Sequence, residues 1–182
     1  MKYIDTSIPD VKIIEPNVFG DERGFFMETF RVDEFTKHCS EKTFVQDNHS
    51  KSSHGILRGL HYQLKNTQGK LVRVTSGKVY DVAVDMRASS PTFGQHVGVI
   101  LSGENKKQLW VPEGFAHGFY VISESAEFVY KCTDYYAPEH EISLAWNDAE
   151  LAINWPLVNN KAPSLSAKDT VALSLSQAPR FK

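Results

Sequence analysis

The sequence predicts a mainly β protein, a jelly-roll barrel or sandwich with a few short helices. Three observations lead to this fold class. Short apolar runs recur along the chain between turn-forming residues, as they do in proteins built from antiparallel strands. These runs are rich in valine and aromatic residues, which favour strands. Apolar and polar residues alternate within them, which fits a jelly-roll barrel whose interior is partly a ligand cavity.

The elements follow from these runs in chain order. We expect strands at residues 11–14, 25–30, 71–76, 79–85, 96–101, 108–111, 115–121 and 127–133. Residues 57–63 have the same strand-like character, and residues 151–155 predict one more strand. A short helix is expected at residues 33–38, and a helical turn or loop at residues 164–169. The polar segment 46–52 is interpreted as a loop, or as a set of amides that read the hydrogen-bonding edge of a ligand.

The length predicts one domain over residues 1–182, because a chain of this size can bury a full hydrophobic core. Hydrophobic residues make up 41% and charged residues 23%, as in ordinary globular proteins. A net charge of −2 gives no reason to expect nucleic acid or membrane as a partner. No apolar run marks the chain for export or approaches the length of a membrane span. Cys39 and Cys132 are expected to be buried free thiols. For these reasons, we expect this domain to be cytoplasmic.

The segment 57–63 carries the most informative side chains of the sequence. Arg58 and His61 lie three positions apart in a strand-like run, and Gly59 lets another chain or a ligand approach closely. Lys70 opens the next strand. An imidazole can accept a proton near neutral pH, and a lysine can stabilise the oxyanion that forms when the proton leaves. This combination indicates chemistry on a carbon acid.

Residues 110–119 contain the spacing Pro-x-Gly-x-x-His, which ends at His117 and resembles the second motif of cupins. In cupins that histidine often binds a metal together with two histidines and a carboxylate of a first motif. That first motif would lie near His61, but the residue two positions on is Gln63, so the ligand set is incomplete and we expect no metal. His49 and His54 are expected to be exposed. His117 can instead be held by Asp81, either as a buried structural histidine or as a substrate contact.

Several further residues allow two interpretations. Arg23 and Glu28 flank an aromatic run and fit an ordinary surface ion pair. Tyr130 shares an apolar face with its neighbours, which is typical of a core tyrosine with a satisfied hydroxyl. The adjacent Tyr135 and Tyr136 offer flat faces on which a base ring could stack.

Taken together, these segments resemble the dTDP-4-dehydrorhamnose 3,5-epimerases, nucleotide-sugar epimerases of the cupin superfamily. Each block is weak by itself, but the blocks occur in order and at the spacing of the family, over nearly the whole chain to about residue 170. They lie at residues 19–26, 46–50, 57–61, 69–72, 111–119, 130–138 and 165–169. Only the tail after Asp169 departs freely from the family pattern, and the resemblance implies that the function of the family does not depend on it.

The resemblance implies a role for each matching residue. His61 would be the base, oriented by Asp169, while Lys70 would stabilise the enolate and Tyr130 would be the general acid. Tyr136 would stack on the thymine, and arginines would hold the diphosphate. The positions that match the substrate contacts of the family are Arg23, Glu28, Gln46, Asn48, Arg58, Lys70, His117, Tyr136, Glu141 and Lys168.

The implied enzyme is an isomerase that converts dTDP-4-dehydro-6-deoxy-D-glucose to dTDP-4-dehydro-L-rhamnose during dTDP-L-rhamnose biosynthesis. It would need no cofactor, because the C4 ketone already acidifies C3 and C5, and the chain has no Gly-x-Gly-x-x-Gly motif. Family members are homodimers, and the aromatic segment around Phe25 and Phe26 fits such a contact. Three alternatives remain at this point: an epimerase that inverts only C3 or only C5, a metal-dependent cupin oxygenase or isomerase, and a non-catalytic sugar-nucleotide binding module.

Overall fold

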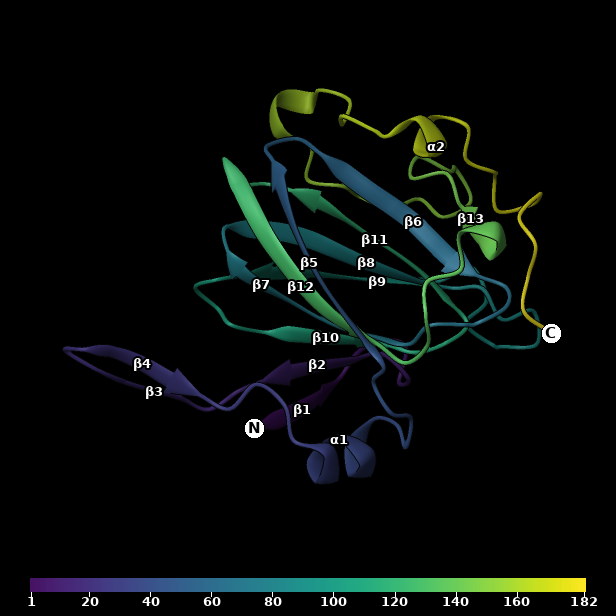
Figure 1. Ribbon diagram of the computed structural model, residues 1–182. Coiled ribbons are helices and arrows are strands. Elements are labelled where there is room, and N and C mark those ends of the chain that lie inside the picture. Colours follow the sequence, from purple (N-terminus) through teal and green to yellow (C-terminus); the bar gives the residue numbers. More distant parts are fainter.

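Two antiparallel β-sheets lie face to face in the computed structural model, which describes residues 1–182 (Figure 1). The six-stranded sheet has the order β1-β2-β10-β7-β12-β5, the five-stranded sheet has the order β13-β6-β11-β8-β9, and β3 and β4 form a separate hairpin. The strands are β1 (Lys2–Asp5), β2 (Lys12–Glu15), β3 (Val18–Asp21), β4 (Gly24–Met27), β5 (Gln46–Ser53), β6 (Leu57–Gln63), β7 (Lys70–Ser76), β8 (Lys78–Asp85), β9 (His96–Ser102), β10 (Gln108–Val111), β11 (Phe115–Val121), β12 (Ser125–Cys132) and β13 (Glu141–Ser143). The helical elements are α1 (Val32–His38), α2 (Ala167–Thr170) and the 3-10 turns η1 (Pro138–His140) and η2 (Val158–Asn160).

The predicted mainly β sandwich is confirmed. Many neighbouring strands in each sheet are far apart in sequence, as in the β2–β10, β6–β11 and β5–β12 pairs, which is the crossing connectivity of a jelly roll. Most expected strands are present within one or two residues, and the predicted helix at 33–38 is α1. None of the helices is long and apolar enough to cross a membrane.

Three predictions about local structure were wrong or incomplete. Residues 151–155 form no strand, because Leu151 and Trp155 bury their side chains in irregular chain just before Pro156. The run 25–30 contributes only the short strand β4, in a hairpin that projects from the body of the molecule (Figure 1). The polar segment 46–52 is strand β5, paired along its length with β12. Its alternate residues are half-buried and exposed, a period-2 pattern carried by polar side chains.

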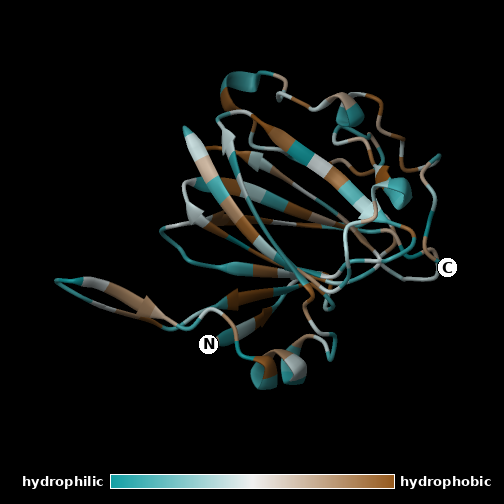
Figure 2. Ribbon diagram, in the orientation of Figure 1, coloured by the Kyte–Doolittle hydropathy of each residue, from teal (hydrophilic) through white to brown (hydrophobic).

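Two apolar clusters hold the sheets in place. The first lies between them and includes Val72 and Phe128 from one sheet and Val79 and Phe119 from the other. The second lies on the outer face of the five-stranded sheet, where the chain after β13 covers it. Strand β8 contributes to both clusters and is buried on both faces, which explains its nearly continuous apolar sequence. Figure 2 shows the hydropathy alternating along the long strands.

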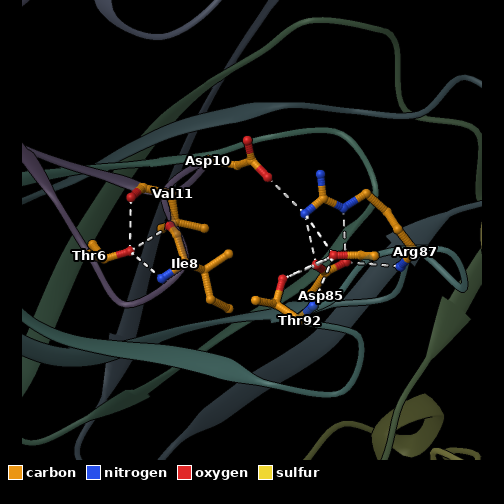
Figure 3. Close-up of polar contacts among 8 residues, drawn as sticks. Thr6, Ile8, Asp10, Val11, Asp85, Arg87 and Thr92 are labelled. Carbon is orange, nitrogen blue, oxygen red and sulfur yellow. Dashed lines mark hydrogen bonds and ion pairs between the residues drawn. The ribbon is translucent and has the colours of Figure 1, made fainter.

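A polar cluster ties the turn after β1 to the end of β8 (Figure 3). The fully buried Asp85 accepts hydrogen bonds from the Arg87 guanidinium, from the Ser90 hydroxyl at 2.6 Å and from the Thr92 hydroxyl at 2.6 Å. Arg87 also donates to Asp10 at 2.8 Å. Burial alone would raise the pKa of Asp85, but these hydrogen bonds outweigh it and lower the pKa to about 2. The carboxylate is therefore ionised whenever the protein is near neutral pH.

Candidate active site

A cavity of about 530 Å³ opens between the two sheets. Strands β5, β7 and β12 supply one wall, β6 and β11 supply the facing wall, and the segment 164–169 closes one side. Of the residues predicted from the sequence as site residues, those that line it are Gln46, Asn48, Arg58, His61, Lys70, His117, Tyr130, Tyr136, Glu141, Lys168 and Asp169.

His61 and Asp169 are in direct contact. The Nε2 atom of His61 lies 2.5 Å from Oδ1 of Asp169, and the other carboxylate oxygen accepts a hydrogen bond from the Ser166 hydroxyl at 2.7 Å. Burial alone would raise the pKa of Asp169, but the hydrogen bonds from His61 and Ser166 outweigh it, so the pKa lies below its ordinary value. An ionised Asp169 favours the tautomer in which Nε2 carries the proton, and this leaves the lone pair of Nδ1 free to act as a base.

Lys70 is the first residue of β7 and extends from the sheet opposite His61. Its side chain lines the cavity and forms no ion pair or hydrogen bond with another residue. Burial lowers the pKa of Lys70, opposed in part by the nearby Cys132, Glu141 and Asp81. A cation with unused donors in a desolvated cavity is well suited to stabilise an oxyanion.

Tyr130 lies on β12, in the wall that faces His61. It is half-buried and packs at a tilt against Phe128, with 5.9 Å between the ring centroids. Burial raises the pKa of Tyr130 to about 12. The phenol is therefore protonated near neutral pH, and it can give a proton to a group inside the cavity from the side opposite His61.

A second histidine–carboxylate pair lies deeper in the same wall. The Nε2 atom of His117 on β11 lies 2.8 Å from Oδ1 of Asp81 on β8, which confirms the predicted contact between these residues. Both residues are buried, and Oδ2 of Asp81 is the one buried side-chain polar atom without a hydrogen-bond partner. His49 and His54 are exposed, as predicted, and no group of three His, Cys, Asp or Glu side chains is placed to hold a metal ion.

The rim of the cavity is a connected polar network. The Gln46 side chain donates a hydrogen bond to the side-chain oxygen of Asn48 at 3.1 Å, and it accepts a hydrogen bond from the backbone N–H of Tyr136 at 3.0 Å. Glu141 accepts hydrogen bonds from the Tyr136 hydroxyl at 3.2 Å and from the Lys168 ammonium at 2.7 Å. These bonds fix the amide groups of Gln46 and Asn48 before a ligand arrives, which favours selective binding.

Arg23 and Glu28 do not line the cavity of their own chain. Arg23 lies on the projecting hairpin, where it pairs with Asp21, and Glu28 lies 4.0 Å from Arg31. The predicted surface pair between Arg23 and Glu28 is therefore wrong, because each has a partner closer in sequence.

The sequence interpretation missed several residues that line the cavity. Ser50 follows Gln46 and Asn48 on the same face of β5, and the period of two along 46–50 would have indicated it. Ser166 precedes Asp169 in a Ser-x-x-Asp pattern, which usually marks the start of a helix. Here the serine hydroxyl bonds the Asp169 carboxylate.

Fold and site together define a jelly-roll protein with a histidine–carboxylate pair, a half-buried lysine and a half-buried tyrosine around one cavity. A family model described as dTDP-4-dehydrorhamnose 3,5-epimerase matches residues 5–177. The chain therefore belongs to the dTDP-4-dehydrorhamnose 3,5-epimerase family.

Individual relatives agree with this assignment. The dTDP-4-dehydrorhamnose 3,5-epimerase of Pseudomonas aeruginosa is 57% identical over 182 residues, which cover 100% of this chain and 99% of the relative. That of Neisseria gonorrhoeae is 59% identical over 99% of this chain, and the chain spans about half (54%) of that relative's length. A crystal structure of dTDP-6-deoxy-D-glucose-3,5-epimerase from Legionella pneumophila, in complex with dTDP-4-keto-L-rhamnose, is 55% identical and has a TM-score of 0.95 over 100% of this chain and 98% of the other.

Proposed function

We propose that this protein is an isomerase that converts dTDP-4-dehydro-6-deoxy-D-glucose to dTDP-4-dehydro-L-rhamnose, a step of dTDP-L-rhamnose biosynthesis. The observation that carries the proposal is the placement of His61 and Tyr130 on facing walls of one cavity, with Lys70 also lining it. Inversion at a carbon requires that the proton leave one face and return to the other. A base and an acid on facing walls meet that requirement.

The proposed reaction begins at a carbon next to the C4 ketone. Nδ1 of His61 removes the proton, and Asp169 stabilises the resulting imidazolium through the Nε2–H hydrogen bond. The electron pair of the broken C–H bond moves to O4, where the Lys70 ammonium stabilises the enolate. Tyr130 then donates its proton to the opposite face of the same carbon, and the ketone forms again. His61 then releases its proton to solvent and Tyr130 takes one up from solvent. With both groups restored, the same steps at the second carbon give the doubly inverted product.

The nucleotide end of the substrate would occupy the rim. The exposed ring of Tyr136 provides a stacking face for thymine, and the amides of Gln46 and Asn48 lie beside it. Arg58 lines the cavity with its guanidinium held by the Ser52 hydroxyl at 2.9 Å, which leaves the other guanidinium donors available for a diphosphate oxygen. Glu141, Lys168 and His117 complete the proposed set of substrate contacts.

The active form in this proposal is a homodimer. The β3–β4 hairpin exposes large apolar side chains, with Phe19 65% and Phe26 71% accessible, and Figure 2 shows its hydrophobic colouring outside the body of the molecule. Such a surface indicates a protein partner. If a second copy receives the hairpin beside its cavity, Arg23 and Glu28 become substrate contacts of that copy, which accounts for their distance from the cavity of their own chain.

The same proposal includes a cytoplasmic location and no nucleic acid or membrane partner. Cys39 and Cys132 are both free thiols, as expected in a reducing compartment.

The direct test is incubation of the purified protein with the 4-keto sugar nucleotide in deuterated water, without added metal or cofactor. NMR should find deuterium at both C3 and C5 with inverted configuration. Label and inversion at a single carbon would identify a single-centre epimerase, and nucleotide binding without label would identify a binding module. Loss of activity after exhaustive chelation, restored by a metal, would instead support a metal-dependent enzyme.

A further inference from the structure

Asp169, the candidate catalytic carboxylate, lies in a segment that has little regular secondary structure. Helix α2 has only four residues and no side-chain cap at its start. Asp169 is 4% exposed, while the side chain of Val171, two residues later, is 78% exposed. Because a single helical turn is unstable in isolation, the flanks of α2 must hold Asp169 in place.

The flank before α2 contributes one bridge. Ser164 pairs with Ile56, the residue before β6. Leu57 N–H donates to Ser164 C=O at 3.0 Å, and Ser164 N–H donates to Gly55 C=O at 2.8 Å. This attachment lies five residues before Asp169, and the first backbone attachment after α2, at Leu173, lies four residues beyond it, so α2 is held from both sides.

The flank after α2 extends the backbone ladder beside His61. Leu173 N–H donates to Ser143 C=O at 2.9 Å, and Leu173 C=O accepts Ala145 N–H at 2.8 Å. Leu144, between those two partners, exchanges hydrogen bonds of 2.8 and 3.2 Å with Leu60, the residue before His61. A continuous set of backbone bonds therefore joins the tail to the strand that carries His61.

The rest of the tail is anchored in the second apolar cluster. Leu175 is 5% exposed and belongs to that cluster, and its N–H donates to the Asp148 carboxylate at 2.9 Å. Phe181 exchanges backbone hydrogen bonds with Met86 and Ala88, at 3.0 and 2.8 Å. The hydroxyl of Tyr62, the residue after His61, donates to Pro179 C=O at 2.5 Å. Both neighbours of His61 in sequence are thus connected to the tail.

We propose that residues 171–182 are a positioning element of the His61–Asp169 pair, an inference that rests on the proposed epimerase function. The tail contacts no substrate. It holds Asp169 at hydrogen-bonding distance from Nε2 of His61 and thereby keeps the lone pair of Nδ1 directed into the cavity. A loosened tail should lower turnover because the hydrogen bond between Asp169 and His61 is weakened. Removal of the Asp169 charge should lower turnover for the same reason.

Two matched leucines test the proposal. Leu175→Ala loosens the tail, and Leu151→Ala removes a side chain of the same kind, 3% exposed, from the same cluster but outside the tail. The melting temperature, Tm, should fall by a similar amount in the two variants. We expect Leu175→Ala to lower kcat on the order of tenfold or more with little change in KM, since small displacements of reacting groups are costly. The kcat of Leu151→Ala should stay within about twofold of the wild-type value, because this substitution displaces the reacting groups far less. Leu175→Met, which keeps a long apolar side chain in the tail, should have a kcat close to that of the wild type.

A readout independent of turnover is the downfield proton resonance of the imidazole N–H that bonds Asp169. It should be present in the wild type and in Leu151→Ala, and weakened or lost in Leu175→Ala. In an Asp169→Asn background, Leu175→Ala should cause no further loss of kcat, because both changes disrupt one interaction. A chain truncated after Leu173 should repeat the effect if it folds.

Equal losses of kcat in the two alanine variants, or a fully additive loss in the Asp169→Asn background, would overturn the proposal. An inactive wild-type protein that retains the downfield resonance would instead contradict the epimerase function, so the two failures are distinguishable.

Discussion

His61 and Tyr130 belong to different sheets and line the same cavity from facing walls. His61 is on β6 of the five-stranded sheet, and Tyr130 is on β12 of the six-stranded sheet. Neither residue would serve an inversion alone, because a base returns the proton to the face from which it came. The two facing sheets of the sandwich place the base and the acid on opposite sides of the cavity, as inversion requires.

Tyr130→Phe should separate proton removal from inversion. His61 can still remove a proton and return one from solvent to the same face, so deuterium should enter the substrate with retained configuration while the L-sugar forms slowly. NMR of the labelled sugar measures both processes. Equal reduction of exchange and inversion in a folded variant would show that Tyr130 is not the acid.

His61→Asn should abolish deuterium exchange at both C3 and C5, because one base is proposed for both carbons. Nucleotide binding should change little, since the rim residues that receive the nucleotide do not depend on the imidazole. Calorimetric titration with dTDP measures the binding. Exchange that persists at either carbon would reveal a second base, for which His117 is placed in the same cavity.

Lys70→Ala should lower kcat on the order of a hundredfold or more with a smaller effect on KM, because the charge is needed most when O4 carries the enolate. Burial lowers the pKa of Lys70, so the ammonium loses its proton at a lower pH than an exposed lysine would. The wild-type kcat should therefore fall as the pH rises through that lowered pKa, and this alkaline limb should be absent in Lys70→Ala. A rise in KM alone would assign Lys70 to ground-state binding.

Asp85→Asn should destabilise the protein near neutral pH without changing the chemistry of the distant cavity. The pKa of Asp85 is lowered from 3.8 to about 2 in the folded protein. Its charge thus contributes about 2 kcal/mol above pH 4, and that contribution is lost as the pH falls toward 2. Denaturant titrations should show the variant and the wild type converging in stability at the acid end. A constant difference across this range would mean that the carboxylate charge is not the stabilising feature.

A mixture of Arg23→Ala and His61→Asn chains tests the proposed homodimer. Each variant alone should have low activity, but a mixed dimer would contain one site with both His61 and the partner's Arg23 intact. Mixing after partial unfolding and refolding should therefore restore part of the wild-type rate. Variants that stay inactive together, although light scattering shows dimers, would place Arg23 outside the shared site.

The candidate site divides into residues that local sequence indicates and residues that it does not. The run around His61 and the Lys70 that opens β7 are recognisable as chemistry in a strand context, and Asp81 was predicted to hold His117. Strand β5 was harder, because its polar residues resemble a loop until β12 is found beside it. The expected strand at 151–155 failed for the opposite reason, since Leu151 and Trp155 are buried without any strand to pair with.

What the sequence by itself determined is the mainly β fold and the family, and it also named the candidate reactive side chains, because these depend on alternating hydropathy and on short motifs that are read locally. Only the tertiary structure decided that His61 and Tyr130 line facing walls of one cavity, that Asp169 contacts His61, and that Arg23 lies outside its own cavity. The physical reason is that these relations depend on which strands pair and how the sheets stack. Residues 61 and 169 lie 108 positions apart, and only long-range packing brings them within 2.5 Å.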